Sequence, residues 1–81
     1  MPYLKSSRRA QLKIPLNVYE AASDLNYLFT RISLDYLGQK GECYQTYNDI
    51  IGALECAKEE FYRRKIASYE NKKIRENGEI I

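Results

Sequence analysis

A chain of 81 residues, with 44% apolar and 30% charged side chains, is predicted to fold as a single domain, residues 1–81, of a size at which one core is barely sufficient. The absence of histidine excludes Ser-His-Asp and Cys-His catalysis and histidine-containing zinc sites, so we expect neither an enzyme nor a bound metal or other cofactor. The lack of any run of about 18 apolar residues predicts a cytoplasmic protein that binds no membrane. A net charge of only +2 makes nucleic acid a weak candidate partner.

The helix signals of the sequence, without an alternating strand pattern, predict an all-α fold that opens with a short N-terminal helical arm. Ser6 or Ser7 can cap a turn that runs to Leu12. Pro15 suits the first turn of a second short helix that reaches about Ala22. Because the residue before a proline disfavours helix, the arm is expected to break between these two turns.

A central helix is predicted from about residue 24 to 37, with Ser23 or Asp24 as its cap and Gly38 after its end. At 3.6 residues per turn, one face of it carries five apolar side chains: Leu25, Leu28, Phe29, Ile32 and Tyr36. This face is the expected core, and a second, smaller apolar face accompanies it. A short helix that is apolar on two faces indicates a buried centre or a subunit interface, so we expect a homo-oligomer.

The longest predicted helix runs from about residue 47 to 76, opened by Thr46 and ended by Asn77-Gly78. Its first half carries an apolar stripe: Tyr47, Ile50, Ile51, Leu54, Ala57 and Phe61. Beyond the stripe, polar side chains occupy the angles where it should continue: Lys65, Ser68 and Lys72. The helix therefore either projects beyond its own core or bends near residues 67–68 and folds back, and its later apolar residues need another surface, most naturally a neighbouring subunit.

The best candidate binding site is the basic segment, Tyr62-Arg63-Arg64-Lys65, where a tyrosine lies beside three cations. Arginine forks match phosphate oxygens, and a tyrosine ring stacks on a nucleobase. The basic segment, together with Tyr69, therefore predicts a site for a small anionic, nucleotide-like ligand. The alternative is a solvated helix face, because glutamates stand four residues before both arginines.

A second candidate lies on the central helix, where polar residues interrupt an apolar element. If a pocket forms there, we expect Asn26, Tyr27 and Arg31 at its wall. A buried cation needs a partner, and the structural interpretation is an ion pair between Arg31 and Glu55 of the long helix. Asp35, four residues after Arg31, is the local alternative.

Residues 24–27 and 48–78 resemble a family of small bacteriophage-encoded proteins usually given without an assigned function. The opening Met1-Pro2-Tyr3 fits the family too, and residues 54–64 are the specific part. Where similar proteins read Ala-Pro-Tyr-Glu, this chain has Ala67-Ser68-Tyr69-Glu70. Because proline bends helices, the resemblance supports a break near Ser68. It brings no known catalytic residues with it.

Small phage proteins that are oligomeric and contain tyrosine and arginine include sponges that sequester nucleotide signals of host immunity. The resemblance therefore implies, as the leading hypothesis, a non-enzymatic oligomer in the bacterial host cytoplasm that binds and sequesters a small anionic, nucleotide-like immune signal. Such a sponge would serve anti-defence, or immune evasion. The alternative is a helical protein–protein interaction module that docks on a host or phage protein without any small ligand.

Overall fold

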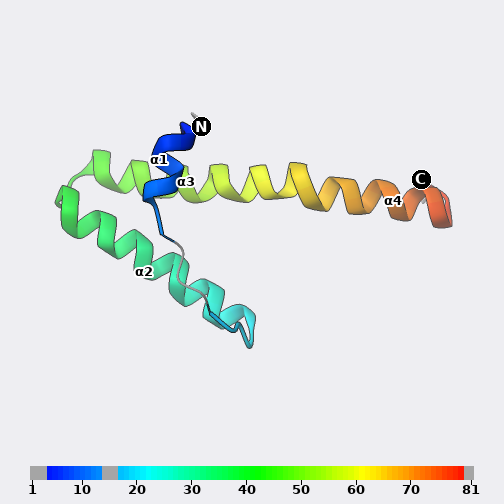
Figure 1. Ribbon diagram of the computed structural model, residues 1–81, viewed down its shortest axis with the longest axis horizontal. Helices are drawn as coiled ribbons and strands as arrows, with labels where there is room; N and C mark the ends of the chain where they lie inside the picture. Colours follow the sequence, from blue (N-terminus) through cyan, green and yellow to red (C-terminus); the bar gives the residue numbers. More distant parts are fainter. Residues whose placement is uncertain (1–3, 14–16, 80–81) are drawn as a thin grey trace. The chain divides into compact units, whose positions relative to one another are not determined.

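The computed structural model describes residues 4–13 and 17–79, and this part is helical without strand (Figure 1). The all-α prediction is therefore confirmed. The helices are α1 (Ser6–Gln11), α2 (Ala22–Lys40), α3 (Tyr44–Phe61), the π-helix η1 (Tyr62–Ile66) and α4 (Ala67–Asn77). The chain divides into two compact units, Met1–Tyr47 and Asn48–Ile81. The single domain over residues 1–81 stays a prediction.

The N-terminal arm contains one short helix, α1, which begins at Ser6. Its N-cap is Lys5, without a side-chain capping bond, and the Ser6 hydroxyl instead accepts a hydrogen bond of 3.1 Å from Arg9 Nη2. The expected cap by a serine is therefore wrong. The prediction of a second short helix in the arm is also wrong over residues 17–21, because these residues are not helical. Pro15 lies outside the described residues.

Helix α2 is longer than predicted at its beginning. It starts at Ala22, so Ser23 and Asp24 are helical residues and not caps. The Asp24 carboxylate reaches back and accepts a 2.8 Å hydrogen bond from the backbone N–H of Glu20. This bond fixes the chain before the helix, since the N-cap residue Ala21 has no side chain able to do so.

Helix α2 ends at Gly41. The prediction that it ends before Gly38 is therefore wrong. Gly41 has φ 87° and ψ 155°, and its N–H bonds the carbonyl oxygen of Leu37 at 2.8 Å. That backbone conformation is almost exclusive to glycine. A single glycine inside a helix, as at Gly38, costs only about 1 kcal/mol relative to alanine, so the helix continues through it.

The two glycines give a matched pair of predictions for stability. Replacing Gly41 with alanine is expected to lower the free energy of unfolding by about 1–3 kcal/mol, because alanine is strained at φ 87°. The same replacement at Gly38 is expected to raise it by about 0.5–1 kcal/mol, because a Cβ there meets nothing within 4 Å. Urea unfolding followed by circular dichroism measures both, and equal effects would contradict the assignment of Gly41 as the helix end.

The long C-terminal helix is confirmed, with a different start. Helix α3 begins at Tyr44, so Thr46 lies inside its first turn and is not the cap. Thr46 is instead the one buried residue of this helix, and its hydroxyl lies 3.3 Å from the Cys43 sulfur. At the other end Gly78, with φ 86°, bonds the Ile74 carbonyl oxygen at 2.8 Å, which confirms the predicted stop.

The long helix contains a π-helical turn after Phe61, and this turn, not a bend, shifts which residues continue the apolar stripe. In η1 the N–H of Ala67 bonds the carbonyl oxygen of Tyr62, five residues earlier, so this turn holds one residue more than an α-turn. Every later position is displaced by one, and Ile66 and Tyr69 take the places predicted for Lys65 and Ser68. The chain stays helical through residues 67–68, so of the two alternatives that the sequence left open, the bend with a fold-back is wrong (Figure 1).

Among the residues that the structure describes, neither unit has a buried apolar side chain. Over residues 4–13 and 17–79, Thr46, 4% exposed, is the only buried residue. The expected core face of the central helix is largely open, with Leu25 42%, Phe29 53% and Ile32 65% exposed. Ile51 and Phe61 of the long helix are 66% and 61% exposed. These apolar faces are therefore available to be covered by something outside their own unit.

Candidate functional site

The basic segment forms most of the π-helix η1, between α3 and α4. The Tyr62 residue is 47% exposed, and the Arg63 and Arg64 side chains are 63% and 60% exposed. Single π-turns inside α-helices are rare and occur frequently at functional sites. The local backbone thus presents the predicted binding residues at the surface of the second unit.

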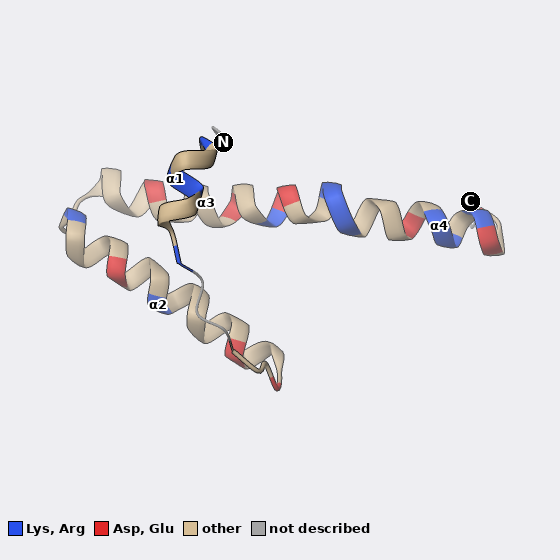
Figure 2. Ribbon diagram, viewed as in Figure 1, with Lys and Arg blue, Asp and Glu red and all other residues tan. Residues whose placement is uncertain are grey.

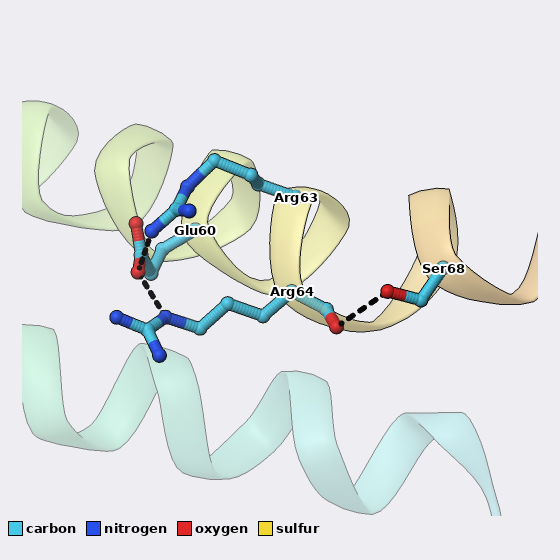
Figure 3. Close-up of polar contacts among 4 residues, drawn as sticks. All are labelled: Glu60, Arg63, Arg64 and Ser68. Carbon is cyan, nitrogen blue, oxygen red and sulfur yellow. Dashed lines mark hydrogen bonds and ion pairs between the residues drawn. The ribbon is translucent and has the colours of Figure 1, made fainter.

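Glu60 holds both arginines of the basic segment (Figure 3). Its Oε1 accepts a bond of 2.8 Å from Arg63 Nη2 and a second bond from Arg64 Nε. The predicted pairing of Arg64 with the glutamate four residues before it is confirmed. Glu60 and the three cations of the basic segment together carry a net charge of +2. It can therefore still attract an anion while its guanidinium groups are held in place.

The Tyr62 hydroxyl is directed to the next turns of the helix and bonds a carboxylate. It donates to Glu70, with distances of 3.1 Å and 3.3 Å to the two carboxylate oxygens. This hydrogen bond, and the negative charge of Glu70, raise the pKa of Tyr62 above its ordinary value. The Tyr62 ring is the part that stays available for stacking.

The pKa of Tyr62 gives a test of this contact. Because the folded-state pKa of Tyr62 is raised, the hydrogen bond to Glu70 is fully intact below the ordinary pKa of tyrosine and is lost as the pH rises through the raised pKa of the folded state. Glu70→Gln removes the charge and is expected to move the Tyr62 transition in an ultraviolet titration to lower pH. Tyr62→Phe identifies which transition belongs to Tyr62, and an unchanged transition in Glu70→Gln would contradict the contact.

Tyr69 lies on α4 beside a shallow pocket of the second unit. Lys73 Nζ lies 5.5 Å from the centre of the Tyr69 ring, a cation–π distance, and also 3.5 Å from Glu76. The pocket has a volume of about 320 Å³, and six residues line it: Tyr69, Glu70, Lys73, Ile74, Asn77 and Gly78. Glu70 and Lys73 are site residues that the sequence reasoning missed, although the Tyr69–Lys73 spacing of four residues was a readable signal.

The second candidate site, on α2, is assembled only in part. Tyr27 lines a pocket of about 260 Å³ in the first unit. The residues that line this pocket are Asn17, Val18, Tyr19, Asp24, Tyr27 and Leu28. Asn26 and Arg31 are not among these described lining residues. Tyr27 therefore lies in a pocket wall, and the binding role of Asn26, Tyr27 and Arg31 stays a prediction.

Arg31 has the local partner that the sequence offered as an alternative. Its Nε lies 3.9 Å from Asp35 Oδ1, and both side chains are more than half exposed, so the pair adds little stability. Glu55 pairs with Lys58 at 3.3 Å. Arg31 and Glu55 belong to different units, and their ion pair stays a prediction.

The remaining chemical features of the described residues are their thiols, their possible metal ligands and the hydropathy of their helices. Neither Cys43 nor Cys56 is part of a disulfide. Within residues 4–13 and 17–79 no group of three histidine, cysteine or acidic side chains is placed to hold a metal ion. Among these same residues, no helix has both the length and the hydropathy needed to cross a membrane.

The predicted binding residues are divided between the two units. The second unit contains Tyr62, Arg63, Arg64 and Tyr69, and the first contains Asn26, Tyr27 and Arg31.

The comparisons with known proteins give a family. No curated protein matches the chain. No solved structure matches it either. One family model, described as a domain of unknown function (DUF6899), matches residues 1–80, which is nearly the whole length. The chain therefore belongs to the DUF6899 family.

Proposed function

We propose that this protein acts by binding and not by catalysis, as a helical interaction protein whose folded state is completed by another protein chain in an oligomer. One observation carries the proposal: across the described residues no apolar side chain is buried, although both units carry apolar faces. Contiguous apolar surface of this kind marks interaction sites in soluble proteins.

Over residues 44–77 the long helix has no buried apolar side chain. An isolated helix is marginal in water, and most helices are stabilised by packing an apolar face. Fully burying one leucine, isoleucine or phenylalanine side chain contributes about 1.5–3 kcal/mol. Because Ile51, Leu54, Phe61 and Ile66 are only 37–66% exposed, covering what remains open would supply on the order of 3–6 kcal/mol for each chain, a large share of the stability of a small domain.

Sedimentation equilibrium tests the proposal, combined with thermal unfolding from about 1 µM to about 100 µM protein. We expect a mass that is a multiple of 9.5 kDa, and a midpoint of unfolding that rises with protein concentration. A folded monomer throughout the series, with a constant midpoint, would mean that the apolar faces are covered within one chain and would overturn the proposal.

A second candidate function is favoured by the basic segment: the oligomer binds and sequesters a small anionic, nucleotide-like ligand, as a phage sponge for a signal of host immunity. This function is supported by the exposed Tyr62 ring, which lies beside two arginines, Arg63 and Arg64, that both pair with Glu60. In this proposal Tyr69, Tyr27 or Arg31 of neighbouring subunits complete the site. Docking on a host or phage protein, without a small ligand, is the competing outcome.

Native mass spectrometry tests this second function on protein purified from bacteria that are producing immune nucleotides. An intact nucleotide, bound in stoichiometric amount and released by heat, is the expected result. The double variant Arg63→Gln/Arg64→Gln is expected to carry none, whereas Arg8→Gln/Arg9→Gln, an equal loss of charge on α1, is expected to keep it. A bare wild-type oligomer would leave protein docking as the function.

A further inference from the structure

The second unit has opposite net charges in its two halves. Residues 48–61 carry four carboxylates and one lysine, a net charge of −3. Residues 62–79 carry six basic and three acidic side chains, a net charge of +3. The acidic positions of residues 48–61 precede a broad basic band at η1, and beyond the band acidic and basic positions are mixed (Figure 2). The sign of the charge therefore reverses close to the first residue of the π-turn.

The apolar stripe crosses this reversal without interruption. Before the turn it consists of Ile51, Leu54 and Phe61, and after the turn of Ile66 and Tyr69, because the extra residue of η1 restores the register. All five are exposed, from 37% at Ile66 to 66% at Ile51. One helix thus offers a continuous apolar seam whose flanking charges are negative at one end and positive at the other.

We infer that a second copy of this chain covers the seam, with its α3–η1–α4 helix running antiparallel and the two π-turns side by side. The inference rests on the proposed function and names its partner. In this arrangement each acidic half lies along the basic half of the other copy, twice over by symmetry. A parallel pair would instead place −3 against −3 and +3 against +3. Flanking charges of this kind set partner choice and orientation between helices packed along an apolar seam.

The dependence on salt separates the two orientations. Charges that attract across an interface lose strength when salt screens them, and charges that repel lose their penalty. Raising NaCl from about 50 mM to about 500 mM is therefore expected to weaken association of the wild-type chain by severalfold. An increase in association over the same range is the behaviour of a parallel pair and overturns the inference.

Spin-label distances test the orientation directly. In a chain with Cys43→Ser and Cys56→Ser, one nitroxide is placed at Asn48→Cys or at Asn77→Cys, both exposed and close to the two ends of the α3–η1–α4 helix. With the two π-turns side by side, two labels at position 48, each 16 residues from the middle of η1, lie about 32 residues apart along the axis, or about 50 Å. Labels at 48 in one copy and 77 in the other lie within about 20 Å, since packed helix axes are about 10 Å apart.

The outcomes distinguish the inference from the proposed function. A long 48–48 distance with a short 48–77 distance supports the antiparallel pair. A short 48–48 distance, or distances that fit neither arrangement, overturns the inference while the proposal of an oligomeric interaction protein stands. A chain that remains monomeric by sedimentation overturns both. The doubly substituted chain, compared with wild type in the same sedimentation series, shows whether the substitutions themselves alter association.

Discussion

Replacing Leu54 with aspartate is expected to reduce self-association by at least about 100-fold, the largest effect of any single substitution in this chain. Leu54 lies on the apolar seam and is 41% exposed within its own unit. An unpaired carboxylate that becomes buried at an interface costs several kcal/mol after desolvation. Because the unit has no buried apolar residues of its own among those described, its helix is also expected to lose much of its circular dichroism signal.

Asn48→Asp is the matched control for this prediction. It adds the same negative charge to the same acidic half of the helix, at an exposed polar position away from the seam. We expect its association constant to stay within about threefold of wild type, since surface charges contribute little. Sedimentation and circular dichroism at several concentrations measure both variants. Equal behaviour of Leu54→Asp and Asn48→Asp would show that the seam is not the interface.

Reversing the basic segment is expected to produce the second largest effect. The triple variant Arg63→Glu/Arg64→Glu/Lys65→Glu changes the net charge of residues 62–79 from +3 to −3, so both halves of the helix become acidic. In an antiparallel pair every flanking contact then becomes repulsive, and we expect the association constant to fall by about 10-fold to 100-fold at low salt. The loss is expected to shrink as NaCl is added.

A partner chain with the opposite change separates interchain effects from local ones. Reversing Arg63 and Arg64 also removes their bonds to Glu60 and adds repulsion within the helix, which costs a few tenths of a kcal/mol for each pair. A chain with Glu55→Lys, Glu59→Lys and Glu60→Lys has two basic halves. Mixed in equal amounts, the two variants are expected to form a heterodimer that is more stable than the homodimer of either variant. Failure of the mixture to associate would assign the loss to damage within each helix.

Several features of this protein could be predicted from the sequence because they depend on residues within one or two turns of each other. The helical class follows from the 3.6-residue spacing of apolar residues. The stop at Gly78 follows from the backbone freedom of glycine, and the bond between Arg64 and Glu60 follows from their spacing of four residues. None of these depends on how distant parts of the chain are arranged.

The sequence was less able to place helix ends, where several residues are nearly equivalent. Gly38 and Gly41 both satisfy the rule for a helix stop, and only the backbone angles distinguish them. Ser6 and Ser23 both satisfy the rule for a cap, yet neither caps. The preferences involved amount to about 1 kcal/mol each, so small differences in the surrounding chain decide between them.

The sequence by itself determined that this is a helical chain without histidine chemistry, with an apolar stripe on a long helix and a basic segment beside it. The tertiary structure decided that the stripe crosses the basic segment by means of a π-turn, and that Tyr62 bonds Glu70 eight residues away. A periodic pattern assumes one fixed number of residues per turn. The single turn that departs from it is set by the competition between two alternative backbone hydrogen bonds, which spacing alone does not resolve.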